Sequence, residues 1–142
     1  MDANAAVIEG EQARPTKRSM LWAGRVLSAV PILMLLMSAA MKLTHQPQMI
    51  AMLGNHLGFR DSAITGIGLL ELVCVVLYAI PATSLVGAVM VTAYMGGAVA
   101  SHVRVGDPFP MPIILAMLAW LGLYLRDRRL RALLPFKRFL TI

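Results

Sequence analysis

The sequence contains one cysteine, Cys74, and few charged residues. A single cysteine excludes an intramolecular disulfide and any C-x-x-C redox pair. Charged residues make up 14% of the 142 residues, whereas an ordinary soluble domain carries about 25%. No G-x-G-x-x-G or P-loop pattern is present, so nothing in the sequence indicates soluble nucleotide chemistry. The three histidines, His45, His56 and His102, lack the close spacing of metal ligands, and we expect no metal site.

Long apolar runs are the dominant feature of the chain. Hydrophobic residues make up 58% of it, and a helix needs about 20 of them to cross the hydrocarbon core of a bilayer. The runs also lack the alternating pattern of barrel strands. The sequence therefore predicts an all-α integral membrane four-helix bundle. Its helices are expected at about 20–43, 62–80, 82–103 and 110–125.

Three segments lie outside these runs. Residues 1–19 are polar and without apolar periodicity, which predicts a disordered cytoplasmic tail. The 44–61 segment joins the first two helices, and Pro47 can open a short helix at the membrane interface. Residues 127–142 are basic with interleaved leucine and phenylalanine, a pattern typical of an amphipathic juxtamembrane tail. The predicted four-helix domain is therefore 20–126.

Lysine and arginine are unevenly distributed between the two sides of the predicted bundle. Four spans place both termini on one side, where the tails carry nine of these residues, and the opposite loops carry three, Lys42, Arg60 and Arg104. The positive-inside rule assigns the more basic side to the cytoplasm. We therefore expect cytoplasmic termini and a multi-pass protein of the inner (cytoplasmic) membrane. We expect no nucleic-acid partner despite the net charge of +6, because attraction to anionic lipid accounts for the basic residues of the two tails.

The second predicted helix contains an acidic residue far from both of its ends. Glu71 lies nine positions into that run, about 13.5 Å along a helix that rises 1.5 Å per residue. This depth is near the midplane of a core about 30 Å thick. An acid there is costly unless it is protonated, paired or hydrated, and such residues face the bundle interior. Two interpretations stay open: Glu71 is a proton carrier or ligand anchor, or it stabilises the bundle through one hydrogen bond.

Further polar residues lie toward the outer ends of the predicted helices, and we expect them to line a pocket that opens outward above Glu71. The candidate catalytic residues are Glu71 and His102, and the candidate ligand-binding residues are Tyr94, Ser101, Arg104, Lys42, Asp107 and Gly97. Asp107 is expected to accept hydrogen bonds from Arg104 or from the first amides of the fourth helix. Gly96 and Gly97 should let a helix or a ligand approach closely.

A second interpretation of these polar residues is structural. Lys42 and Arg104 can extend to the lipid headgroups while their stems stay in apolar surroundings. Glycines and hydroxyl residues within the helices can serve helix packing alone. The sequence does not separate this interpretation from a ligand pocket.

The third apolar run reads "GAVMVTAYMGGAVASHVRVGDP" and follows a short turn with Pro81 and a helix with a central Glu-Leu pair. With "MKL" at 41–43 and "GLLEL" at 68–72, it resembles the DoxX-like family of small four-helix membrane proteins, over residues 41–126. The most specific positions of this resemblance are Tyr94, Gly96, Gly97, Ala98, His102, Arg104, Gly106 and Asp107.

The resemblance implies a four-helix membrane fold and a redox-associated role. The family is named after the small membrane subunit of a thiosulfate:quinone oxidoreductase, so the resemblance implies a quinone as the ligand and no covalently bound cofactor. Relatives that handle disulfides rely on cysteine pairs, and this chain has one cysteine.

Three functions therefore stay open. The first is a redox-associated subunit that binds a quinone-like or other small lipophilic ligand beside Glu71. The second is a non-enzymatic accessory subunit of a membrane complex. The third is a small acid–base enzyme that acts on a lipophilic substrate with Glu71 as its acid. The sequence has no haem, flavin or iron–sulfur signature, so the first two functions require a membrane or peripheral protein partner as well as the lipid bilayer.

Cysteine labelling tests the topology. Single cysteines are introduced in a Cys74→Ala background, one in the 127–142 tail and one in the 44–61 loop. With a membrane-impermeant maleimide added to intact cells, we expect the loop to be labelled and the tail to be protected until the cells are opened. Labelling of the tail from outside would reverse the predicted orientation.

Overall fold

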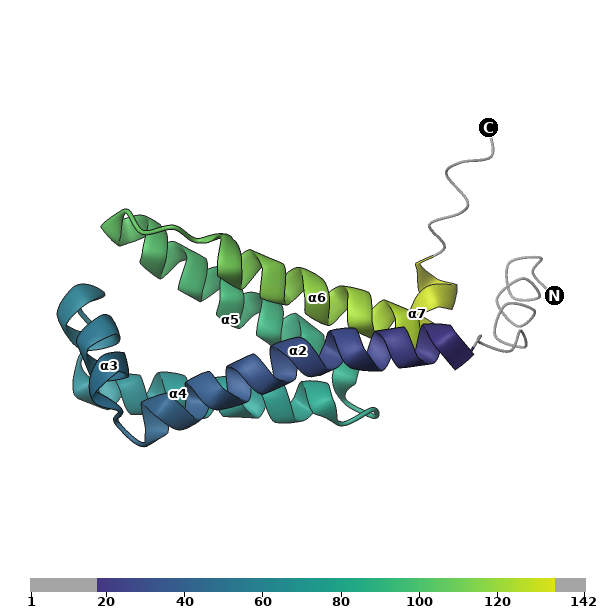
Figure 1. Ribbon diagram of the computed structural model, residues 1–142, viewed down its shortest axis with the longest axis horizontal. Coiled ribbons are helices and arrows are strands. Elements are labelled where there is room, and N and C mark those ends of the chain that lie inside the picture. Colours follow the sequence, from purple (N-terminus) through teal and green to yellow (C-terminus); the bar gives the residue numbers. More distant parts are fainter. Residues whose placement is uncertain (1–17, 135–142) are drawn as a thin grey trace.

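The computed structural model describes residues 18–134, and the regular structure within that range is helical (Figure 1). Within these residues, four long helices, α2 (Arg18–Leu43), α4 (Asp61–Ala79), α5 (Ser84–Val105) and α6 (Pro110–Arg126), are accompanied by three short ones. The short helices are α3 (Pro47–Ile50), the π-helix η1 (Ala51–His56) and α7 (Arg128–Leu133). The disordered tail predicted for residues 1–19 and much of the predicted 127–142 tail lie outside the described residues.

The predicted all-helical class is confirmed, and the helix bounds lie close to those expected. Three helices, α2, α4 and α5, are long and apolar enough to cross a membrane. The fourth apolar helix, α6, has 17 residues, which is shorter than the span length of about 20. A short helix does begin at Pro47, and it continues into η1.

Local sequence explains where α4 and α5 end. Ile80 precedes Pro81 and has an extended backbone, as expected because a proline disfavours helical geometry at the residue before it. At the end of α5, Gly106 adopts a left-handed conformation with φ 77°. The N–H groups of Gly106 and Asp107 then donate to the carbonyls of Val103 and His102 at 3.2 and 3.0 Å, the pattern that closes a helix at a glycine.

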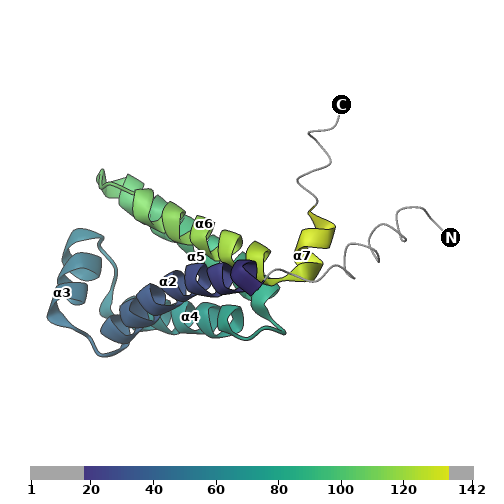
Figure 2. The same ribbon diagram turned by 45° about the vertical axis from the view of Figure 1, so that its right-hand side comes forward.

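The four long helices form two pairs that meet at one end of the molecule. Helix α2 packs against α4 and α6, and α5 packs against the same two helices. Figures 1 and 2 show the α2–α4 pair and the α5–α6 pair converging near the beginning of α2 and diverging toward the opposite end, where α3 and η1 lie. We call these the narrow and the wide end of the bundle.

Close contacts between backbones hold the narrow end together. A Cβ built at Gly122 of α6 would lie 2.5 Å from Ser28 Oγ of α2, and one at Gly87 of α5 would lie 2.2 Å from the Tyr78 backbone nitrogen of α4. The hydroxyl of buried Tyr78 donates to the Ala119 carbonyl at 2.7 Å and is also hydrogen-bonded to Ser28 Oγ at 3.0 Å. Glycine at these contacts lets the helices approach closely.

Two glycines expected at a close contact have another environment. No atom of a neighbouring helix lies within 4 Å of a Cβ built at Gly96 or Gly97. Of the two partners expected for them, the approach of a ligand stays a prediction, whereas a closely packed helix is wrong. The reason is the rotation of α5: Val91 and Met95 face the core, and this turns both glycines away from the neighbouring backbones.

The outward faces of the long helices are apolar. Large exposed side chains include Leu33 and Met37 of α2, Val86 of α5, and Met117 of α6. In water such a continuous apolar surface would be unfavourable, whereas in a bilayer it contacts acyl chains of similar polarity. The surface is therefore consistent with a membrane-embedded bundle.

The glycine contact at the narrow end predicts a stability difference between two single-methyl changes. Gly122→Ala places a methyl against Ser28 and should lower the free energy of unfolding by about 1–3 kcal/mol, the usual cost of overpacking. Gly66→Ala is the matched control, because nothing lies within 4 Å of its Cβ position on α4. Thermal unfolding in detergent should show a lower Tm for Gly122→Ala alone. Equal Tm values would contradict the close contact.

Candidate functional site

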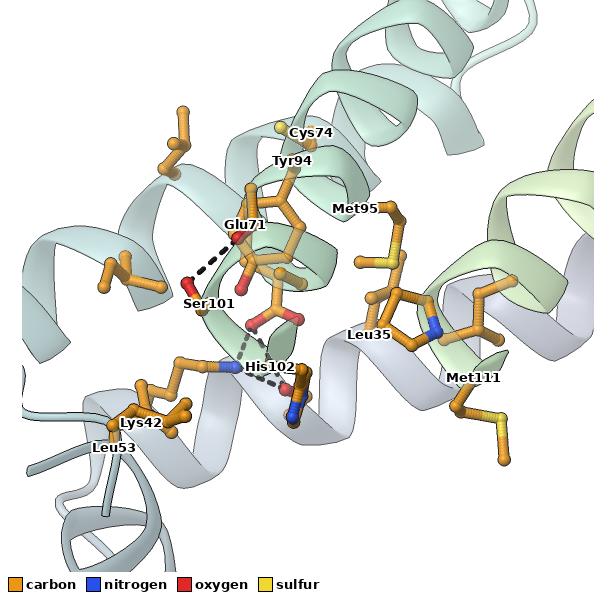
Figure 3. A pocket seen from close by; sticks show the side chains of 18 of the residues that line it. Leu35, Lys42, Leu53, Glu71, Cys74, Tyr94, Met95, Ser101, His102 and Met111 are labelled. Atoms are coloured by element: carbon orange, nitrogen blue, oxygen red, sulfur yellow. Dashed lines mark hydrogen bonds and ion pairs between the residues drawn. The ribbon is translucent and has the colours of Figure 1, made fainter. Parts of the chain in front are cut away.

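A cavity of about 740 Å³ lies between the two helix pairs toward the wide end (Figure 3). All four long helices line it, together with η1 and the residues just after it. Its walls are mainly apolar, and five of its lining side chains are methionines, Met34, Met52, Met90, Met95 and Met111. Methionine is flexible and polarizable, so a wall rich in it adapts to the shape of a ligand.

The most polar part of the cavity wall is a cluster of three side chains from α2 and α4. Lys42 Nζ forms an ion pair with Glu71 Oε2 at 2.8 Å. Ser38 Oγ accepts a hydrogen bond from Lys42 and donates to the same carboxylate oxygen at 3.3 Å. Figure 3 shows the Lys42 ammonium directed at the Glu71 carboxylate. The second carboxylate oxygen, Oε1, takes part in neither bond.

The local sequence brings this cluster together. Ser38 and Lys42 lie four residues apart, so they are neighbours on one face of α2. Gly68 precedes Glu71 by three residues on the facing side of α4, and a Cβ at Gly68 would lie 2.9 Å from Lys42 Cβ. The absence of a side chain at Gly68 therefore lets α4 approach α2 where the ion pair forms.

The ion pair is buried within the bundle, where it forms part of the cavity wall. Glu71 is 1% exposed and Lys42 is 6% exposed. The prediction that Glu71 faces the interior is confirmed, whereas the interpretation that Lys42 extends to the headgroups is wrong. Lys42 points inward because Glu71 offers its ammonium a partner, and an unpaired charge inside the bundle would be far more costly.

Six of the eight predicted site residues line the cavity: Lys42, Glu71, Tyr94, Gly97, Ser101 and His102. Figure 3 shows the Tyr94 side chain pointing toward the Glu71 carboxylate. The Ser101 hydroxyl donates to the Gly97 carbonyl within α5 at 2.9 Å, so it is partly used by its own helix. Gly97 has open space at its Cβ position, which leaves room for a ligand.

Arg104 and Asp107 do not line the cavity. The hydrogen-bond partners predicted for Asp107 are also wrong. Arg104 donates to the Leu57 carbonyl just after η1. Asp107 Oδ2 pairs with His56 Nε2 at 2.8 Å, and His102 Nδ1 lies 3.5 Å from the same oxygen. The turn at Gly106 explains this, because it folds Asp107 back over the last turn of α5 and toward η1. Both residues thus connect the end of α5 with η1 and the residue just after it.

The hydrogen bond from His56 lowers the pKa of the Asp107 carboxyl below its ordinary value. Any stability that this pairing adds is therefore present above the ordinary pKa of an aspartate and is lost as the pH falls through the lowered value. His102 Nδ1 is buried and has no hydrogen-bond partner among the described residues. Those residues also contain no group of three or more metal-binding side chains.

Two parts of the site were not predicted from the sequence. Ser38 could have been found, because it lies one helical turn before Lys42 on the same face. The second part is the wall formed by Met52, Leu53, Leu57 and Phe59. These residues belong to a short connection of mixed polarity, and nothing in the sequence indicates that it folds back over the helix ends.

The arrangement can hold a molecule that is apolar with a small polar end. Lys42 and Tyr94 supply N–H and O–H donors, and the Glu71 carboxylate supplies an acceptor. A ligand carbonyl can accept from the donors, and a ligand hydroxyl can donate to the carboxylate. Since the surroundings are apolar, each such hydrogen bond is stronger than it would be in water.

Removing one partner of the ion pair should destabilise the bundle more than removing both. Lys42→Met leaves the Glu71 charge buried without its ammonium and should lower the free energy of unfolding by about 3–5 kcal/mol. The double variant Lys42→Met, Glu71→Leu removes both charges and should recover much of this loss. Unfolding in detergent measures both. A Lys42→Met variant as stable as the wild type would show that the pair contributes nothing to the fold.

Comparison with known proteins identifies the family of this chain. No curated protein and no solved structure matches it significantly. The model of the DoxX-like family matches residues 26–122, a range that contains the cavity, the Lys42–Glu71 pair and the polar end of α5. The chain therefore belongs to the DoxX-like family.

Proposed function

We propose that this protein is a multi-pass membrane protein that binds a small lipophilic, quinone-like molecule beside the Lys42–Glu71 pair. The observation that supports this proposal is the cavity of about 740 Å³ with the Ser38–Lys42–Glu71 cluster in its wall. Small-molecule sites commonly enclose about 300–1,000 Å³ and combine apolar walls with few polar groups. Helix packing alone does not require such a space, because well-packed interiors contain few voids larger than a water molecule.

A quinone-like ring fits the chemistry of the wall. Its ring would contact the methionine side chains, whose thioethers interact favourably with aromatic systems. Its carbonyl oxygens are acceptors for Lys42 or Tyr94, and the hydroxyls of the reduced form are donors for Glu71. Such a ligand supplies redox chemistry, and the residues of this chain bind and orient it.

The proposed function includes four membrane spans with both termini in the cytoplasm. Helix α6 is about 25 Å long at 1.5 Å per residue, somewhat less than the core thickness of about 30 Å. It packs along α2 and α5 and exposes apolar side chains, among them Ile113, Ile114 and Met117. A bilayer can thin locally around a short span at modest cost. The uneven distribution of lysine and arginine supports the orientation and the inner membrane.

The role that fits this binding site is that of a redox-associated subunit with a protein partner. The sequence has no signature of a haem, flavin or iron–sulfur site, so electrons would have to come from another protein. The alternative, a purely accessory subunit, requires no bound lipophile, and ligand binding separates the two roles.

Filling the cavity tests the proposal with a matched pair of variants. Gly97→Leu adds a side chain that enters the cavity, whereas Gly96→Leu adds the same side chain to the neighbouring position, which does not line it. With a short-chain ubiquinone as the probe, we expect Gly97→Leu to weaken binding at least tenfold in native mass spectrometry. Gly96→Leu should bind the probe like the wild type.

Glu71→Gln tests the polar contact at the same site. It keeps the size of the side chain but leaves the buried Lys42 ammonium without its carboxylate, so Tm is measured beside binding. In the folded variant we expect weaker binding of the reduced probe, whose hydroxyl loses its carboxylate acceptor. Equal binding by the wild type and Gly97→Leu would end the cavity proposal. Normal binding by Glu71→Gln alone would remove Glu71 from the site and keep the cavity.

A further inference from the structure

A second pocket lies at the narrow end of the bundle, away from the Lys42–Glu71 pair. Its volume is about 560 Å³, and it is bordered by the first turns of α2, the α4–α5 link, the end of α6 and the beginning of α7. Figures 1 and 2 both place these segments at the same end of the molecule. Four arginines, Arg25, Arg126, Arg128 and Arg129, line it together with one acid, Asp127. The pocket is therefore strongly positive.

Two of these residues are fixed by the fold itself. Arg126 donates to the Tyr78 carbonyl at 2.9 Å, and its guanidinium lies 5.0 Å from the centroid of the Tyr78 ring. The Asp127 side chain accepts from the backbone N–H of Arg129 at 2.8 Å and so caps α7. The single acid of the pocket is thus engaged with the start of a helix. Within residues 18–134, neither Arg25 nor Arg129 forms an ion pair with a carboxylate.

The surroundings place this positive pocket at the level of lipid headgroups. It lies at the ends of membrane-length helices, and the Arg25 guanidinium is 5.7 Å from the centroid of the Trp22 ring. Trp22 is 56% exposed, as is typical of tryptophans at the boundary between acyl chains and headgroups. Leu21 and Leu123 supply apolar surface within the pocket. Apolar surface next to arginines matches a molecule with a hydrocarbon part and an anionic head.

We propose that this pocket binds a phosphate group, with an anionic phospholipid of the inner leaflet as its source. The planar guanidinium forms two parallel hydrogen bonds to phosphate oxygens, which an ammonium cannot do. Arg25 and Arg129 approach the phosphate from α2 and α7, and Arg126 adds positive charge from the end of α6. Free inorganic phosphate offers the same oxygens but has no hydrocarbon part to contact the leucines.

Lipid titration tests the proposal on the full-length protein in detergent. Phosphatidylglycerol or phosphatidylcholine is added, and native mass spectrometry counts the bound lipids. We expect phosphatidylglycerol to bind more tightly, because the choline cation is repelled by the arginines. The double variant Arg25→Gln, Arg129→Gln should lose about fivefold in affinity per arginine, as expected for basic residues near an anionic lipid.

Two further variants and a comparison of two salts complete the test. The double variant Arg25→Lys, Arg129→Lys keeps the charge and should lie between the wild type and the glutamine variant. Arg60→Gln, at the far end of α4, removes one charge outside the pocket and should leave binding unchanged. Sodium phosphate is compared with sodium chloride at equal ionic strength, so that screening is matched.

Two outcomes would overturn the proposal. One is equal affinity for the two lipids, and the other is wild-type affinity for phosphatidylglycerol in the glutamine variant. If sodium phosphate displaces the lipid, the pocket takes phosphate from either source. If it does not, the pocket is specific for the lipid. Both of these results support a phosphate site, and neither depends on a ligand in the Lys42–Glu71 cavity.

Discussion

The ion pair between Lys42 and Glu71 places two opposite charges among helices that are mostly apolar. Each charge alone would be strongly unfavourable there, so α2 and α4 are held in the one register that keeps the two groups 2.8 Å apart. Gly68 permits that approach, and Ser38 provides a further hydrogen bond to the carboxylate. The pair therefore fixes one helix pair of the bundle and also gives the cavity its polar end. A substitution that improves packing here would at the same time change the site.

The cavity exists because the two helix pairs are locked at one end only. At the narrow end, Gly87 and Gly122 bring backbones into contact, and Tyr78 connects α2, α4 and α6. At the wide end the pairs diverge, and η1 forms part of the cavity wall between them, packed through Leu53 and Leu57 against Ile64. The contacts of Arg104 with Leu57 and of His56 with Asp107 hold η1 to the end of α5. Polar contacts thus connect the elements at the wide end, whereas close backbone packing joins those at the narrow end.

The sequence predicted those features that depend on the chemistry of single segments. Helix bounds followed from the length of apolar runs, and the burial of Glu71 followed from the cost of exposing an acid to lipid. Features that depend on helix rotation were not predictable. Gly68 and Gly96 look alike in the sequence, yet Gly68 faces Lys42 and Gly96 faces open space. The pairing of Asp107 with His56, which lies 51 residues away, depends on the path of η1.

Photoaffinity labelling in native membranes tests the central claim most directly, because it requires a quinone-like molecule to enter the cavity. A photoreactive short-chain quinone is bound, illuminated, and its adducts are mapped by peptide mass spectrometry. Two methionines serve as internal reporters, since Met95 of α5 lines the cavity and is buried, whereas Met37 of α2 is exposed on the outer surface. The account predicts adducts at Met95 and at other lining residues such as Met90, and their loss with excess unlabelled quinone. Adducts at Met37 and other outward-facing residues, unaffected by competition, would contradict it.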